Sequence, residues 1–181
     1  MRLRTKNLAD YAQDKAFRTP EAVAIYLENG EHIRFGSIFK EAMALATSLS
    51  NLGLKAGDVI SFQLPNWRET VALDIAAVWL GLVVNPVIPI YRDHELAFIL
   101  ADSRCRCLFI PGVYRGYDFP EMIERLSPEL PDLQHVITVR DDAQREGAAN
   151  TMLRYENLIE PRNELVPAKQ PTDMSAVKVV M

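Results

Sequence analysis

The sequence predicts an α/β protein, with a mostly parallel sheet, flanking helices and a small N-terminal hairpin. Between residues 59 and 139, short apolar segments of strand length alternate with segments of helical periodicity, which is typical of a parallel sheet. Within 37–52, apolar residues recur at steps of four and three, as on the buried face of one helix. The dipeptide Asn29-Gly30 favours a tight turn and predicts the hairpin.

The amino-terminal elements come before the alternating region. A helix is expected over 7–17, with Leu8, Tyr11, Ala12 and Lys15 on the face that packs against the core. Apolar strand-like segments at 23–27 and 32–35 flank the tight turn. The helix over 37–52 then leads into the sheet.

The alternating region contains four strands and three helices. Its first helix is apolar nearly all round and should therefore be covered on most sides. Asn66 and Glu69 resemble a capping box at the start of that helix. The expected strands are 59–64, 82–87, 105–110 and 135–139, and the expected helices are 67–80, 93–101 and 119–126.

The chain changes character after Arg140. Residues 1–140 are predicted to form an α/β N-terminal subdomain. Residues 141–175 read as a polar, proline-containing connector with one short helix at 151–158. Residues 176–181 recover the pattern of a strand.

Composition excludes several classes of protein. A formal net charge of −4 gives no basic surface for nucleic acid. The apolar stretch at 71–90 is interrupted by one charged residue, Asp74, and by Gly81, Asn85, Pro86 and Pro89, so no integral membrane protein is expected. No apolar run of the kind that a secretory signal requires follows the basic N-terminus. Cys105 and Cys107 are expected on one face of a strand as reduced thiols, which favours a cytoplasmic protein.

Motifs of common enzymes do not occur in this sequence. It has no Walker loop, dinucleotide-binding glycine motif, nucleophile elbow or zinc-protease helix, and its three histidines are widely spaced. No catalytic or metal-binding residue is therefore predicted. Asp141 and Asp142 read as part of a solvated loop. Residues 92–95 form the densest polar cluster beside a strand end, although Asp93 and Glu95 also suit the first turn of a helix.

Five segments, in order and in register, resemble the amino-terminal third of the adenylate-forming acyl-CoA synthetases. The similarity extends from Leu8 to about Val139, and the segment at 88–92 is closer to ligases of medium-chain, aromatic or alicyclic acids than to acetate enzymes. The segments that carry the resemblance are 20–24, 35–49, 52–66, 81–92 and 94–103.

The resemblance implies an activity for the parent protein. Members of this family activate a carboxylate with Mg-ATP, release pyrophosphate and pass the acyl group to a thiol, usually coenzyme A. The implied cofactors are therefore ATP, Mg²⁺ and coenzyme A, and the implied substrate is a small carboxylic acid. Basic residues after the Asn-Pro-type strand end of related ligases approach the nucleotide part of coenzyme A, which makes Arg92 the one candidate ligand contact.

The family's ATP-gripping loop, rich in serine, threonine and glycine and ending in Pro-Lys-Gly, is not in the sequence. It would follow the strand at 176–181, so Met181 is expected to be a boundary within a longer protein. The expectation is an N-terminal portion that binds no cofactor tightly and is inactive alone.

Three other functions remain open at this level. The same scaffold serves adenylation domains that load a carrier protein and luciferase-like oxidoreductases. A free-standing α/β binding or oligomerisation module would need no ATP chemistry. Sheet edges and apolar surface left exposed also predict a homo-oligomer formed through those edges.

Overall fold

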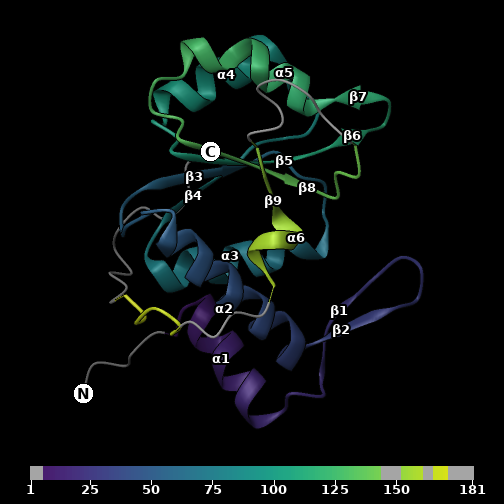
Figure 1. The fold of residues 1–181 in the computed structure, drawn as a ribbon. Coiled ribbons are helices and arrows are strands. Elements are labelled where there is room, and N and C mark those ends of the chain that lie inside the picture. The colour runs from purple at the N-terminus through teal and green to yellow at the C-terminus, as the bar shows by residue number, and fades with distance from the viewer. Residues whose placement is uncertain (1–5, 144–151, 161–164, 171–181) are drawn as a thin grey trace.

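A computed structural model of the chain describes residues 6–143, 152–160 and 165–170. It confirms the α/β class: a five-stranded parallel sheet lies between two layers of helices, with an antiparallel hairpin at one side (Figure 1). The strand predicted at 176–181 lies outside the described residues. No helix in the described ranges combines the length and apolarity needed to cross a membrane.

The elements follow one another along the chain much as the pattern predicts. The helices are α1 Leu8–Arg18, α2 Phe35–Asn51, α3 Arg68–Leu80, α4 Asp93–Asp102, α5 Phe119–Leu126 and α6 Tyr155–Leu158, with a 3-10 turn at Ser127–Glu129. The strands are β1 Val23–Tyr26, β2 His32–Arg34, β3 Val59–Phe62, β4 Val83–Pro86, β5 Cys107–Pro111, β6 Val113–Tyr114, β7 Tyr117–Asp118, β8 His135–Val139 and β9 Leu153–Arg154.

The sheet has the strand order β4-β3-β5-β8-β9, and every neighbouring pair is parallel. Ile60 in β3 is opposite Val84 on one side and Cys107 on the other, which sets the register of the centre. Helices α1, α2 and α3 lie below this sheet in Figure 1, and α4 and α5 lie above it. Both faces are therefore covered, as parallel sheets require.

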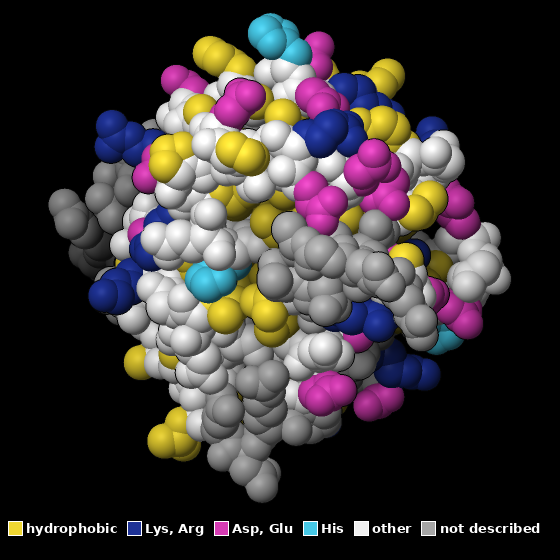
Figure 2. Space-filling model, turned by 45° about the horizontal axis from the view of Figure 1, so that its top comes forward, with side chains coloured by type: hydrophobic (Ala, Val, Ile, Leu, Met, Phe, Trp, Pro, Cys, Tyr) yellow, Lys and Arg dark blue, Asp and Glu magenta, His cyan; other side chains and the backbone are white. Residues whose placement is uncertain are grey.

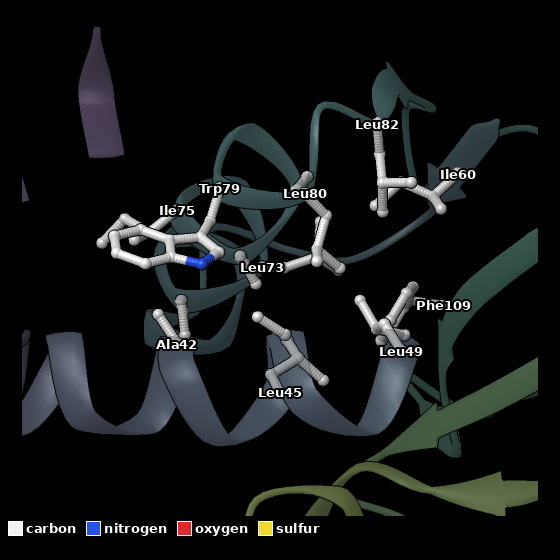
Figure 3. Close-up of a cluster of buried hydrophobic side chains, with 14 of the residues drawn as sticks. Ala42, Leu45, Leu49, Ile60, Leu73, Ile75, Trp79, Leu80, Leu82 and Phe109 are labelled. Atoms are coloured by element: carbon white, nitrogen blue, oxygen red, sulfur yellow. The ribbon is translucent and has the colours of Figure 1, made fainter. Parts of the chain in front are cut away.

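The larger core lies between the sheet and α2 and α3. In Figure 3, Leu45 of α2 and Leu73 of α3 point toward each other, while Phe109 reaches the same cluster from β5. On the other face, Leu96 of α4 and Leu108 of β5 belong to a separate buried cluster. Alternate residues of β5 therefore serve opposite cores, which explains why the whole strand is apolar.

Helix ends show which local signals operate. Asn7 and Asp10 form the capping box of α1: the Asp10 amide donates to Asn7 Oδ1 (2.8 Å) and the Asn7 amide to Asp10 Oδ2 (3.1 Å). Gly81 ends α3 in the left-handed conformation, with φ of 72°. The capping box expected from Asn66 and Glu69 is wrong, because Trp67 is the N-cap of α3 and Glu69 pairs elsewhere.

Two expectations about the first helices need correction. Ala12 is buried as expected, but Leu8 and Tyr11 are 44% and 47% exposed and Ala9 is buried in their place, since small side chains allow the helix to pack closely on α2 and α3. The chain enters α2 at Phe35, where a strand end was expected.

The two cysteines do not share a face. Cys107 lies in β5 and packs with the core below the sheet, whereas Cys105 precedes the strand and packs with α4 and α5. Alternation applies only within a strand, and Arg104, with φ of 50°, turns the chain just before β5 begins.

The connector expected at 141–175 also contributes to the sheet. Leu153–Arg154 adds β9 as a fifth parallel strand beside β8, and the short helix is Tyr155–Leu158. Of the helix expected at 151–158, Leu153 and Arg154 therefore belong to β9, Met152 precedes the strand, and Thr151 lies outside the described residues.

Candidate functional site

The strand order has a switch point at β3 and β5. From β3 the chain crosses by α3, on one face, to β4; from β4 it crosses by α4, on the other face, to β5. In open parallel sheets, ligands bind beyond the carboxyl ends of the strands at such a point. We call this region the carboxyl edge, and define it by residues 63–67, 87–92, 112–117 and 140–141.

Arg92 lies on the carboxyl edge, between β4 and α4. Its guanidinium stacks on the Tyr117 ring, 4.1 Å from the centroid, and its Nη1 donates to the carbonyl oxygens of Pro89 and Tyr91, each at 2.8 Å. Within the described chain it has no ion-pair partner. The fold therefore holds a half-buried guanidinium at this edge without pairing it to a carboxylate in the described chain.

Asp93, in contrast, has its charge compensated. Its carboxylate accepts hydrogen bonds from Arg125 Nε (3.0 Å) and from the Tyr117 hydroxyl (3.3 Å). The hydrogen bond from Arg125 is the main reason that the pKa of Asp93 is lowered. Glu95 Oε2 accepts from the backbone amide of Arg92 at 3.4 Å, as the first turn of a helix allows. Asp93 is therefore neutralised by an ion pair, whereas Arg92 in the same cluster has none among the described residues.

A second arginine, Arg140, lies at the end of β8. Its Nε and Nη2 donate to the two carboxylate oxygens of Glu69, at 3.0 and 2.9 Å, and its guanidinium is 4.3 Å from the centroid of the Trp67 ring. Glu69 is only 4% exposed. Such a two-pronged pair between a buried carboxylate and arginine ties the end of β8 to the start of α3.

The pair continues into a buried network below the edge. Arg68 forms an ion pair with Glu41 of α2, and the Tyr155 hydroxyl donates to the other oxygen of that carboxylate at 2.7 Å. Burial raises the pKa of Tyr155 strongly, so its hydroxyl stays protonated and remains a donor. This network fastens α6 to α2 and α3 and has a structural role.

Asp141 is buried, which corrects the expectation of a solvated loop. It is 6% exposed and lies against Gly112, where an added Cβ would be 2.5 Å from Asp141 Oδ1. The Ala143 amide donates to the same oxygen at 3.3 Å. Gly112 therefore lets β5 and the end of β8 approach each other closely. Asp142 stays exposed.

Other candidate chemistries find little support. The described residues contain no group of three or more histidine, cysteine, aspartate or glutamate side chains placed to hold a metal ion. Cys105 and Cys107 are free and buried, and burial raises the pKa of Cys105 to about 11, so its thiol is unreactive at neutral pH.

A cavity of about 280 Å³ opens near the amino end of β8, away from the carboxyl edge. His135 on its wall is bound to the backbone, with its Nε2 3.1 Å from the Leu52 carbonyl oxygen. The lining residues are Leu52, Ile123, Glu124, Ser127, Gln134, His135, Val136, Met152 and Leu153.

The hairpin β6–β7 was missed at the sequence level, and with it Tyr117, the ring under Arg92. The turn places Arg115 at φ 51° and Gly116 at φ 76°, the pair of positive angles that a tight two-residue hairpin needs. A glycine between Tyr114 and Tyr117 was the available signal.

Charges of both signs are mixed on the face that carries α4 and α5. Figure 2 shows basic, acidic and apolar side chains interspersed there among the described residues, without a broad basic area.

Comparison with known proteins identifies the family to which this chain belongs. A family model described as AMP-binding enzyme matches residues 12–177. The chain belongs to the AMP-binding enzyme family. Among its relatives, the medium-chain fatty-acid–CoA ligase of Escherichia coli K12 is 30% identical over 133 residues, which are 74% of this chain and 24% of that protein. The vibriobactin-specific 2,3-dihydroxybenzoate-AMP ligase of Vibrio cholerae is 30% identical over 73% of this chain and 24% of its own length.

Solved AMP-binding enzymes share the fold. The crystal structure of an anthranilate CoA ligase in complex with anthranoyl-AMP matches with a TM-score of 0.75 and 21% identity, over 91% of this chain and 29% of that one. The chain thus spans about a quarter of the length of the curated relatives it matches. The resemblance seen in the sequence is confirmed.

Proposed function

We propose that this chain is the amino-terminal part of an ATP-dependent carboxylate–CoA ligase. The observation that carries the proposal is the AMP-binding match over 12–177, together with relatives named as CoA ligases of medium-chain and aromatic acids. The parent protein would convert an acid and ATP to an acyl-adenylate and pyrophosphate, and then transfer the acyl group to coenzyme A with release of AMP.

The chemistry explains why ATP is needed. A free carboxylate resists attack by a thiolate, whereas an acyl-adenylate readily expels AMP. The protein must hold the reacting atoms in line and neutralise phosphate charge with cations and aimed donors. The sequence contains no glycine-rich phosphate loop, so we propose that this chain alone does not complete the reaction and binds neither ATP nor coenzyme A tightly.

Arg92 is the proposed contact for the nucleotide part of coenzyme A. Its support is geometric: the guanidinium is at the carboxyl edge, is held on an aromatic ring and has no carboxylate partner in the described chain. Coenzyme A carries phosphates that such a cation can bind. Glu69 excludes Arg140 from the same role, because it occupies two of that guanidinium's nitrogens.

The proposed activity is tested on the full-length parent. Pyrophosphate release is measured with a panel of medium-chain, aromatic and alicyclic acids, followed by acyl-CoA formation on adding coenzyme A. We expect both products from the parent and no pyrophosphate from the 181-residue chain. ATP turnover by the chain alone would contradict the claim that it is incomplete.

The role of Arg92 has its own test in the parent. Arg92→Ala should raise the KM for coenzyme A about tenfold, the effect of losing one charge-assisted hydrogen bond, and leave pyrophosphate release unchanged. Arg18→Ala is the matched control, since Arg18 is exposed on α1 and pairs with Asp14. An unchanged KM for coenzyme A would refute the contact.

Transfer to a carrier protein is a second candidate function. Two relatives are named 2,3-dihydroxybenzoate-AMP ligases, and those names mention no coenzyme A. Supplying the parent with coenzyme A or with a phosphopantetheinyl carrier protein distinguishes the acceptors. We further propose a cytoplasmic protein that can associate through exposed sheet edges, which sedimentation at several concentrations would test.

A further inference from the structure

Gln63 is a buried amide at the switch point. It directly follows β3, and its backbone amide continues the pairing with β5 by donating to the Phe109 carbonyl oxygen at 2.8 Å. Its side chain is 0% exposed. The side-chain Nε2 crosses to the loop after β4 and donates to the carbonyl oxygens of Ile88 (3.2 Å) and Tyr91 (2.9 Å).

The hydrogen bonds determine which way the amide points. Two carbonyl oxygens can be satisfied only by the nitrogen of the Gln63 amide, since the opposite orientation would bring three acceptors together. In this orientation both amide hydrogens are used, and Oε1 is left buried without a hydrogen-bond partner. An unpartnered buried acceptor lowers stability, so this residue is poorly explained by stability alone.

The contacts of Gln63 lead directly to Arg92. The Tyr91 carbonyl oxygen accepts from Gln63 Nε2 and also from Arg92 Nη1, at 2.8 Å. The second carbonyl that Arg92 uses, that of Pro89, lies inside the same turn. Gln63 therefore holds the backbone that aims the guanidinium at the Tyr117 ring. The exposed Ile88 and Ile90 side chains give this turn little packing of its own.

We propose that Gln63 is a positioning residue for coenzyme A binding: its amide holds the 88–91 turn and so orients Arg92. The inference rests on the proposed function for the ligand, but the orientation of Arg92 is a property of this chain. Gln63 itself contacts no reacting atom; it acts only by orienting Arg92. Loss of its two donors should therefore weaken acceptance of coenzyme A and leave adenylation unaffected.

The first experiment concerns the 181-residue chain without any ligand. The Arg92 Nε–Hε resonance, assigned by its loss in Arg92→Ala, reports on the Tyr117 ring next to it. Gln63→Met, which keeps the length and removes both donors, should move this resonance toward that of an exposed arginine. Gln134→Met makes the same change at an exposed site and should leave it in place. An unmoved resonance in a folded Gln63→Met chain overturns the proposal.

A second variant keeps the test decisive if Gln63→Met does not fold. Gln63→Asn keeps a buried amide but is one methylene too short to reach both carbonyls, so it should shift the Arg92 resonance as well. Melting temperatures of all variants are recorded, and the shift must appear in a chain that melts cooperatively. A folded Gln63→Asn chain with the wild-type resonance overturns the proposal equally.

The second experiment uses the full-length parent. Gln63→Met should raise the KM for coenzyme A about tenfold, with the KM for ATP and the rate of pyrophosphate release unchanged. Combined with Arg92→Ala, it should add no further increase, because both changes remove the same contact. An additional increase in the double variant, or an equal loss of pyrophosphate release, overturns the proposal.

If Arg92→Ala itself leaves the KM unchanged while Gln63→Met still moves the Arg92 resonance, the coenzyme A contact is refuted and the positioning is supported.

Discussion

Arg92 and Arg140 occupy similar places at the carboxyl edge and have different partners. Each follows a strand of the parallel sheet, and each guanidinium lies on an aromatic ring, at 4.1 Å from Tyr117 and 4.3 Å from Trp67. Arg140 makes two hydrogen bonds to the buried carboxylate of Glu69. In the described chain, the guanidinium of Arg92 donates hydrogen bonds to backbone carbonyls only, which leave its positive charge in place.

The difference separates a structural arginine from a binding one. A guanidinium paired with a buried carboxylate stabilises the fold, and removal of either partner leaves the other charge in a poor environment. A guanidinium held by neutral carbonyls is equally well oriented but remains available to an anion. Replacement of Arg140 should therefore lower the stability of the chain, whereas replacement of Arg92 should weaken ligand binding.

The largest effect is expected at the paired arginine. Arg140→Ala should lower the free energy of unfolding by about 2–4 kcal/mol, because it leaves Glu69 buried with only the more distant Arg68, whose Nε is 3.7 Å away. Urea denaturation of the 181-residue chain measures the loss. Replacing both partners with leucine should recover most of it, since no buried charge remains. A loss no greater than that of Arg92→Ala would remove the distinction.

The contrast between a paired and an unpaired charged group also applies to carboxylates, and Asp74 of α3 is the unpaired example. Asp74 has no hydrogen-bond or ion-pair partner in the described chain, and burial raises its pKa to about 6 from the usual 3.8. Because the pKa of Asp74 is higher in the folded state than in the unfolded state, its ionisation opposes folding. Below about pH 3.8 the group is protonated in both states, and the free energy of unfolding is not reduced by it. This stability is lost as the pH rises through about 6, where the buried carboxyl of the folded chain ionises.

Replacement of Asp74 by asparagine should therefore stabilise the chain at neutral pH. We expect Asp74→Asn to raise the free energy of unfolding by about 1–2 kcal/mol at pH 7.5, less than the shift alone implies because the side chain is partly hydrated. The gain should shrink toward zero near pH 4. Urea titrations at several pH values measure it, with Asp102→Asn, an exposed change on α4, as control. A gain that does not depend on pH would contradict the explanation.

The smallest effect on stability is expected at Arg92. Arg92→Ala should lower the free energy of unfolding by only about 0.5–1 kcal/mol, the size of a partly exposed cation–π contact. The same urea experiment measures it beside Arg140→Ala. A loss above about 2 kcal/mol would make Arg92 a structural tether and weaken its assignment as a ligand contact.

Much of the fold could be predicted because its signals are local. The periodicity of α2 and the alternation of apolar strands with helices identified the layers, and the string of family segments identified the scaffold. Arg92 could be named from its place after a strand end. Its role in coenzyme A binding stays a prediction.

The partners of these residues could not be predicted. Glu69 and Arg140 are 71 residues apart, and Glu69 in the first turn of a helix is as well explained by a capping box as by a distant arginine. Tyr117 stands on a two-residue strand too short to show alternation. The two residues of β9 become a strand only because β8 offers them a free edge.

The sequence by itself determined the α/β class, the order of most elements and the family, since each depends on spacing along the chain. Only the tertiary structure decided which arginine at the sheet edge is neutralised and which keeps its charge. The reason is physical: the state of a charged group depends on what surrounds it within a few ångströms, and residues distant in sequence supply those surroundings.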